Sequence, residues 1–184
     1  MRWLSYGVFV VGLAVSLPFV QAGEFKLEPG FTLIFNGKNL DGWQAKGKKD
    51  SSFEGKTDAF KGRFKVQAGS LVVDPAVKGD SYLETNKEFA KDVTIKFDFK
   101  AGAKCNNDIF LRGIKFDIVP GNKENKSVKE GEWASMEIVV TGDKVEHKVN
   151  GEVARTSKIK STSSTFVIRA EFGAIEIKNI RVKS

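Results

Sequence analysis

The chain has 184 residues, of which 41% are hydrophobic, and its 30 Lys and Arg against 23 Asp and Glu give a net charge of +7. This size suits one ordinary domain with a proper core, and excludes a small fold that depends on disulfides. A single histidine excludes a histidine cluster for a transition metal, and a single cysteine excludes an intramolecular disulfide.

The first residues have the features of a secretory signal peptide. The chain begins with Met1-Arg2, continues with an apolar run over 8–20, and Val20-Gln21-Ala22 is typical of a signal-peptidase site with cleavage after Ala22. The run is short for a bilayer span, which needs about 20 residues, so an uncleaved membrane anchor is the weaker alternative. We therefore expect a signal peptide at 1–22, a single domain at 23–184, and a periplasmic or extracellular bacterial protein without stable membrane insertion after cleavage.

The basic residues are mostly Lys, spread along the chain and alternating with acids. This pattern indicates a solvated surface, with weak attraction to anionic polysaccharide as the alternative. No arginine-rich segment or nucleic-acid-binding motif is present, so no nucleic-acid partner is expected. Cys105 is interpreted as a small buried residue; the alternative is a nucleophile with His147 as its partner.

Most of the chain alternates apolar and polar residues with a period of two, which is typical of half-buried strands. The clearest cases are 93–99 and 166–172, and Gly142-Asp143 and Asn150-Gly151 carry hairpin-turn signals. The same pattern covers Phe64–Val66, Leu71–Val73, Ile109–Arg112, Ile114–Val119 and Met136–Val140. Many short strands with frequent glycine turns predict an all-β fold, a two-sheet antiparallel β-sandwich.

Near the C-terminus the alternation shifts by one residue. Ile175 and Ile177 are in phase with each other, but Ile180 and Val182 are one position out. A β-bulge around Lys178-Asn179 would return all four side chains to one face.

Five short blocks occur in an order that resembles the bacterial 3-keto-disaccharide hydrolase family. The resemblance covers about 30–184 and implies a concanavalin-like jelly roll whose concave sheet carries a carbohydrate site. The blocks are Gly30–Trp43, Asp108–Gly113, Gly131-Glu132-Trp133, Val149-Asn150-Gly151 and Ile177–Val182.

One segment that matters for chemistry departs from the family pattern. The family has approximately Asn-Ser-Gly-Ile-Phe-Leu-Arg-Gly there, followed by a strand with Glu and Gln. Here Asn106-Asn107-Asp108 replaces Asn-Ser-Gly, Asp117 stands in place of the Glu, and Val119 stands in place of the Gln. Arg112 is the candidate residue that matches best.

The resemblance implies chemistry on 3-keto sugars. A carbonyl at C3 makes the C2 proton acidic, so that a carboxylate base can remove it and the enolate can expel the substituent on C1. Strand alternation would bring Arg112 and Asp117 to one polar surface, with Asp117 as the base and Arg112 as the stabiliser of the enolate oxygen. The alternative is a structural ion pair between the two.

Further candidates have two interpretations each. His147 shares a strand face with Val145 and Val149, which indicates a core residue, or else a proton-transfer residue. Trp43 and Trp133 are either core residues or rings that stack on sugars. The polar segment Asn106-Asn107-Asp108 is a candidate for binding sugar hydroxyls.

No cofactor is evident from the sequence. Calcium at the 106–108 segment stays open, although no calcium-loop motif supports it. The Glu-x-Asp-x-x-Glu pattern of jelly-roll glucanases is absent, so ordinary hydrolysis by two facing carboxylates has no local motif behind it. The prediction is a secreted carbohydrate-active protein whose partner is an oligosaccharide or 3-keto sugar. The alternatives are a non-catalytic carbohydrate-binding module and a structural protein of the cell envelope.

Overall fold

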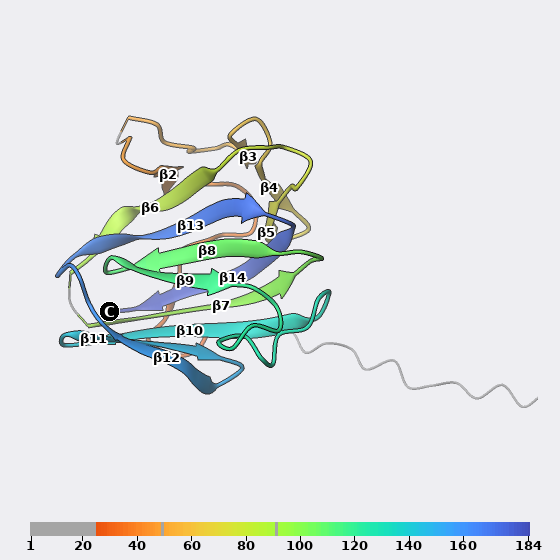
Figure 1. The fold of residues 1–184 in the computed structure, drawn as a ribbon. Helices are drawn as coiled ribbons and strands as arrows, with labels where there is room; N and C mark the ends of the chain where they lie inside the picture. Colours follow the sequence, from red (N-terminus) through yellow and green to blue (C-terminus); the bar gives the residue numbers. More distant parts are fainter. Residues whose placement is uncertain (1–24, 49, 91) are drawn as a thin grey trace, which may run out of the picture.

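The computed structural model describes residues 25–48, 50–90 and 92–184, and these residues form two antiparallel β-sheets (Figure 1). The strands are β1 (Thr32–Leu33), β2 (Trp43–Ala45), β3 (Asp58–Ala59), β4 (Phe64–Gln67), β5 (Ser70–Val73), β6 (Ser81–Phe89), β7 (Val93–Ala101), β8 (Asn106–Leu111), β9 (Ile114–Ile118), β10 (Trp133–Thr141), β11 (Lys144–Val149), β12 (Glu152–Lys158), β13 (Ser164–Phe172) and β14 (Ile175–Lys183).

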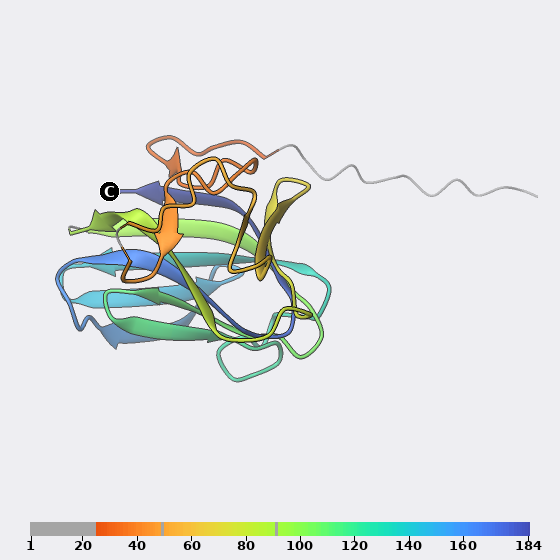
Figure 2. The same cartoon turned by 90° about the horizontal axis from the view of Figure 1, so that it is seen from above.

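The sheets differ in size and lie face to face as two layers (Figure 2). The nine-stranded sheet has the order β12-β11-β10-β7-β14-β5-β4-β3, with β1 added along β14. The five-stranded sheet has the order β2-β6-β13-β8-β9. The predicted two-sheet antiparallel sandwich is therefore confirmed.

The core fills the space between the sheets, as strand alternation predicts. On β7 the residues Val93, Ile95, Phe97 and Phe99 are buried, and their neighbours in sequence are only partly buried. Opposite them, Phe166 of β13 packs against Phe97 with ring centroids 6.0 Å apart. The outward face of each sheet is thus left to polar residues, and any site must lie on one of these faces or at an edge.

Tight turns fix the register of the hairpins. Asn150-Gly151 joins β11 to β12 with both φ angles positive (52° and 84°), as a type I′ turn requires. Arg112-Gly113 joins β8 to β9 in the same way, with φ angles of 55° and 73°. The predicted bulge near the C-terminus is confirmed, because the β14–β7 register shifts between Lys178 and Arg181.

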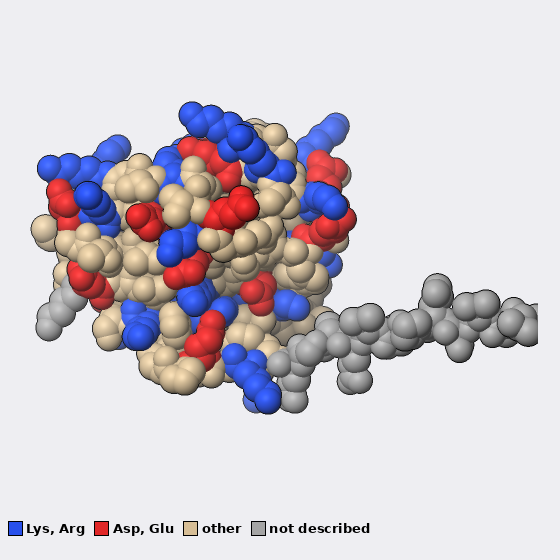
Figure 3. Space-filling view, turned by 90° about the horizontal axis from the view of Figure 1, so that it is seen from below, with Lys and Arg blue, Asp and Glu red and all other residues tan. Residues whose placement is uncertain are grey.

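The predicted signal peptide, 1–22, lies outside the described residues. Within the part of the chain that is described, no helix is both long and apolar enough to cross a membrane. On the side of the molecule nearest β11 and β12, acidic and basic side chains alternate without a large area of one sign (Figure 3). This mixture fits the predicted solvated surface.

Candidate active site on the five-stranded sheet

A row of polar residues crosses the outer face of the five-stranded sheet. Strand pairing places Asp117 of β9 opposite Asp108 of β8, and Asp108 opposite Arg169 of β13. Arg169 is in turn paired with Tyr82 of β6. The β8–β9 hairpin and two strands from other parts of the sequence therefore bring two carboxyls, a guanidinium and a phenol into one line.

The two carboxyls differ in their exposure to solvent. The Asp108 side chain is fully buried, whereas that of Asp117 is 32% exposed. Lys115 lies beside both carboxyls, with its ammonium 2.5 Å from Asp117 Oδ1 and 3.8 Å from Asp108 Oδ1. Within the described residues, Asp108 Oδ1 has no hydrogen-bond donor. A molecule on this face can thus reach Asp117 and Lys115 directly, with Asp108 beneath them.

The environment moves the two pKa values in opposite directions. Burial raises the pKa of the Asp108 carboxyl to about 6, the hydrogen bond from Arg169 opposes this shift, and the neighbouring Asp117 adds to it. Burial also acts against ionisation of Asp117, but the hydrogen bond from Lys115 and the proximity of Asp108 hold its pKa below the ordinary value. Around neutral pH the pair therefore holds a permanently ionised member and a member that exchanges its proton.

Arg169 connects this pair to the rest of the face. Its Nη1 donates to Asp108 at 2.8 Å and also lies 2.8 Å from Glu171, while its Nη2 donates to Asp80 at 2.5 Å. The guanidinium carbon lies 5.5 Å from the centre of the Tyr82 ring. Three carboxylates around one guanidinium fix its position, so Arg169 orients Asp108.

A second row runs beside the first. It contains Lys115, Phe110, Val167, Glu84 and Gln44, which are successive partners across the five strands. The Phe110 ring lies 6.3 Å from that of Tyr82. The exposed Lys46 places its ammonium 5.1 and 5.3 Å from these two ring centres. The face thus has aromatic side chains next to charged ones.

Arg112 does not join Asp117 on this surface, contrary to expectation. It follows the last residue of β8 as the first residue of the hairpin turn, and it is 2% exposed. Its guanidinium donates to the carbonyl of Thr162, and its backbone N–H donates to Ser164 Oγ at 2.8 Å. These contacts tie the turn to the start of β13, and the cation beside Asp117 is Lys115.

His147 lies in the core, as the first of its two interpretations holds. It is fully buried and its ring stacks on Phe116 with centroids 4.7 Å apart. Burial, with a smaller contribution from the charge of Arg155, lowers the pKa of His147 to about 3. Phe116 points inward from the strand whose outward residue is Asp117, so the sheet separates the imidazole from the carboxyl pair.

The polar segment before Asp108 divides between the two faces. Asn107 is buried and binds the backbone of the neighbouring strand, donating to the Phe172 carbonyl at 3.0 Å and accepting from the Glu171 N–H at 2.8 Å. Asn106 is half-buried at the beginning of β8. Cys105 is buried, and burial raises the pKa of its thiol. Only Asp108 of the three predicted sugar-binding residues reaches the polar row.

The two candidate tryptophans are also apart from the site. Trp43 is a core residue whose Nε1 donates to the Ile34 carbonyl at 2.8 Å. Trp133 is 42% exposed, but it lies on the outer face of the other sheet. There Lys178 and Lys100 place their ammonium groups 3.9 and 5.2 Å from the centre of the ring.

Sequence reasoning missed β6 and the partners it supplies, Tyr82 and Glu84. Polar Thr85 and exposed Lys87 stand in phase with the buried Leu83 and Phe89, which weakens the alternation that identifies a strand. Arg169 was visible as an outward residue of its strand, but its pairing with Asp108, 61 positions earlier, depends on a register that no local pattern encodes.

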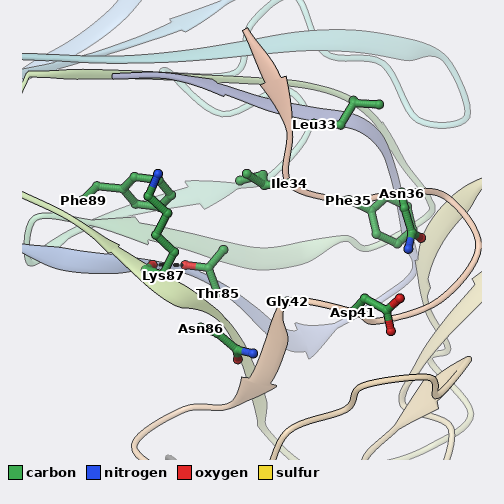
Figure 4. Close-up of a pocket in the computed structure, with 10 residues that line it drawn as sticks. All are labelled: Leu33, Ile34, Phe35, Asn36, Asp41, Gly42, Thr85, Asn86, Lys87 and Phe89. Carbon is green, nitrogen blue, oxygen red and sulfur yellow. Dashed lines mark hydrogen bonds between the residues drawn. The ribbon is translucent and has the colours of Figure 1, made fainter.

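A pocket of about 390 Å³ opens along the edge of β6, beside the segment that joins β1 to β2 (Figure 4). Its walls include the buried rings of Phe35 and Phe89. Asp41 also lines it, but one oxygen of that carboxylate accepts the Gly55 N–H at 2.6 Å. The pocket has no second carboxylate among its lining residues, so it offers no acid–base pair.

No group of three or more His, Cys, Asp and Glu side chains in 25–48, 50–90 and 92–184 is arranged to hold a metal ion. The side chains of this face offer an accessible carboxylate, an accessible ammonium and a buried carboxyl with a raised pKa.

The fold and the family of the chain follow from comparison with known proteins. The family model of the 3-keto-alpha-glucoside-1,2-lyase-like domain matches 30–121 and 115–183, which together make up most of the chain. The protein belongs to this family. No curated protein matches the sequence of this chain.

Solved structures share the sandwich at low sequence identity. A suspected glycosyl hydrolase from Parabacteroides distasonis ATCC 8503 has a TM-score of 0.67 at 19% identity, over 84% of this chain and 93% of its own. A laminarinase from Flavobacterium sp. UMI-01 has a TM-score of 0.53 at 17% identity, over 82% and 97%. The carbohydrate-binding module CBM66 from Bacillus subtilis has a TM-score of 0.50 at 11% identity, over 79% and 97%. The chain thus has a jelly-roll fold that occurs in glycosyl hydrolases and in carbohydrate-binding modules.

Proposed function

We propose that the protein cleaves 3-keto glycosides by elimination at the outer face of the five-stranded sheet. The observation that carries the proposal is the carboxyl pair of Asp108 and Asp117, with its divided pKa values and the Lys115 ammonium beside it. Two neighbouring titratable groups whose pKa values are shifted in opposite directions by their surroundings are a common arrangement in acid–base catalysis.

The reaction takes place in two balanced stages. Asp117 takes the proton from C2, the C–H electrons form the enolate of the C3 ketone, and the enolate collapses to a C1–C2 double bond. The substituent on C1 departs with its bonding electrons and takes up a proton. Water then adds its hydroxyl to C1 and a proton returns to C2, which gives the free 3-keto sugar.

Each residue has a role set by its exposure. Asp117 is accessible and ionised, so it can touch the C2 proton. The side chain of Lys115 is 45% exposed, and its pKa is raised, chiefly by its hydrogen bond to Asp117, so it remains a cation that can stabilise the enolate oxygen. Asp108 is fully buried and acts through Asp117, as a positioning residue that takes up and releases the one proton of the pair.

The comparisons support the substrate class. The matching family is described as 3-keto-alpha-glucoside-1,2-lyase-like, and this name specifies elimination across C1 and C2 of a 3-keto glucoside, which breaks the bond from C1 to the glycosidic oxygen. The carboxylate that the resemblance suggests as the base, Asp117, has a cation beside it, but this cation is a lysine three positions after Arg112.

A non-catalytic carbohydrate-binding module is the second candidate. Tyr82 and Phe110 on the same face favour it, because aromatic side chains beside polar ones bind sugars without any chemistry. In that case the Asp108–Asp117 pair would bind sugar hydroxyls only.

The test is a rate measurement on a 3-keto glucoside that carries a chromogenic leaving group. Release from the keto form, with none from the unoxidised glucoside, is the expected result. Asp117→Asn is expected to lower the rate by about 10²-fold or more, the range for loss of a positioned base. The matched control is Asp143→Asn, in the exposed β10–β11 turn, which is expected to keep the wild-type rate.

Release from both glucosides at equal rates would contradict elimination, because the unoxidised sugar has no acidic C2 proton. A wild-type rate in Asp117→Asn would remove this residue from the mechanism. If the wild-type protein releases nothing and yet binds the glucoside, the binding-module function replaces the enzyme.

A further inference from the structure

Three hollows lie along the outer face of β6, which β13 separates from the strands of the carboxyl pair. The largest, of about 580 Å³, is lined by Glu84, Asn86 and Glu88. The second hollow along the strand, of about 220 Å³, is lined by Asp80 and Tyr82. The third hollow, of about 310 Å³, lies beyond the beginning of the strand.

Shared walls connect these hollows into one track. Lys46 lines the first and the second, and Asp80 lines the second and the third. From Tyr82 to Glu88 the track follows every second residue of β6, which is about 20 Å at the rise of a β-strand. A length of this order exceeds what a single sugar ring occupies.

The floor of the largest hollow is held rigidly. Glu84 is 7% exposed, and its Oε1 accepts from Gln44 Nε2 at 2.9 Å and from the Gly47 N–H at 3.0 Å. Its Oε2 accepts from Thr165 Oγ1 at 2.9 Å. A buried carboxylate held by donors from both sides of β6 gives a fixed acceptor at the centre of the track.

The charges of this hollow oppose an anionic ligand. Within the described part of the chain neither Glu84 nor Glu88 has an ion-pair partner, since their contacts are hydrogen bonds from neutral donors. Among the described residues, Lys46 is the one cation that lines this hollow, while Lys48 also lines the second hollow and Arg63 and Lys78 line the third. The walls also offer amide and hydroxyl groups from Asn86 and Thr165. In the largest hollow two carboxylates, neutral donors and one described cation suit a neutral, hydroxyl-rich ligand, and in the third hollow Asp80 and Glu171 accompany the two cations.

We propose that this track is a second carbohydrate site, which binds an extended neutral oligosaccharide along β6, apart from the carboxyl pair. The pair lies on β8 and β9, which β13 separates from β6. The track would hold a long glycan at the protein surface while the pair acts on a 3-keto unit. This role rests on the proposed function only for its benefit to catalysis, since binding needs neither oxidised sugar nor turnover.

The test is calorimetric binding of unoxidised neutral gluco-oligosaccharides, from the disaccharide to the hexasaccharide, to the purified protein. Affinity is expected to rise by about tenfold or more with chain length, which corresponds to about 1.4 kcal/mol. Asn86→Ala is expected to weaken hexasaccharide binding several-fold. Its matched control is Lys87→Ala, at the next residue of the same strand, which does not line the track and is expected to bind as the wild type does.

Equal affinity for the disaccharide and the hexasaccharide would overturn the proposal, as would unchanged binding in Asn86→Ala. Binding of an oligogalacturonide hexamer as tight as that of the neutral hexamer would overturn the charge argument. Asp117→Asn is expected to bind the neutral hexamer normally. If the protein binds the hexamer but does not cleave the 3-keto glucoside, only the proposed elimination fails. If it cleaves the 3-keto glucoside but does not bind the hexamer, only the proposed second site fails.

Discussion

Asp108 and Asp117 face each other across the β8–β9 hairpin as register partners, one fully buried and the other one-third exposed. Lys115, on the same strand as Asp117, lies within ion-pair distance of both. The hairpin therefore builds the pair locally, and β13 adds Arg169 from a distant part of the chain.

The pair should make stability fall as pH rises from about 4 to 6. The folded pKa of Asp108, about 6, is above the ordinary value of 3.8, so in this window the folded state binds more protons than the unfolded state. Asp108→Asn removes this contribution. The unfolding free energy of the variant minus that of the wild type should therefore increase by on the order of 2 kcal/mol from pH 4 to pH 7. Urea denaturation across that range measures the gap. A gap that stays constant with pH would show that Asp108 ionises normally.

His147 should contribute the opposite pH dependence. Its folded pKa, about 3, lies below the ordinary value of 6.5, so stability is present above pH 6.5 and is lost progressively as pH falls toward 3. His147→Phe keeps a ring against Phe116 and should flatten this acid-side slope. Thermal unfolding between pH 4 and 7 tests it, and the rate on a 3-keto glucoside should stay at the wild-type level. A large loss of rate in a folded variant would return His147 to the site.

Arg112 should matter for stability. Its buried guanidinium donates to the Thr162 carbonyl just before β13, so Arg112→Ala should lower the unfolding free energy by about 2 kcal/mol, as expected for a lost hydrogen bond from a charged group. Arg112→Lys should recover part of this loss. Chemical denaturation compares the three proteins. Full stability together with an abolished rate would point to a chemical role that this geometry does not provide.

Trp133 and Trp43 should differ sharply when truncated. Trp133→Ala, on the outer face of the nine-stranded sheet, should leave oligosaccharide binding and the reaction rate unchanged. Trp43→Ala should cost about 3–5 kcal/mol of stability, because the ring is fully buried against Phe166. Loss of binding in Trp133→Ala would place a sugar site on the opposite sheet.

Local patterns predicted most of the fold. The alternation in β7 and β13, the Asn150-Gly151 turn and the bulge after Lys178 all follow from neighbouring residues, and all are present. Such features depend on backbone conformation and on which face is buried, and both are encoded within a few positions.

The site was harder to predict because it depends on pairing between distant strands. Alternation placed Asp117 outward correctly, but it could not show that Asp108 and Arg169 would be its neighbours. Arg112 was assigned to the strand when it is a turn residue with positive φ, and a turn directs its side chain differently. Lys115, two residues before Asp117, was visible and takes the place beside the carboxylate.

The most direct test of the central claim is the fate of the C2 hydrogen. A 3-keto glucoside is incubated with the protein in D₂O, and the product is analysed by NMR beside a sample without protein. The account predicts that the released sugar carries deuterium at C2, faster than the protein-free exchange, and that Asp117→Asn shows neither release nor labelling. Release of a sugar that retains its original hydrogen at C2 would show direct hydrolysis and would contradict elimination at the Asp108–Asp117 pair.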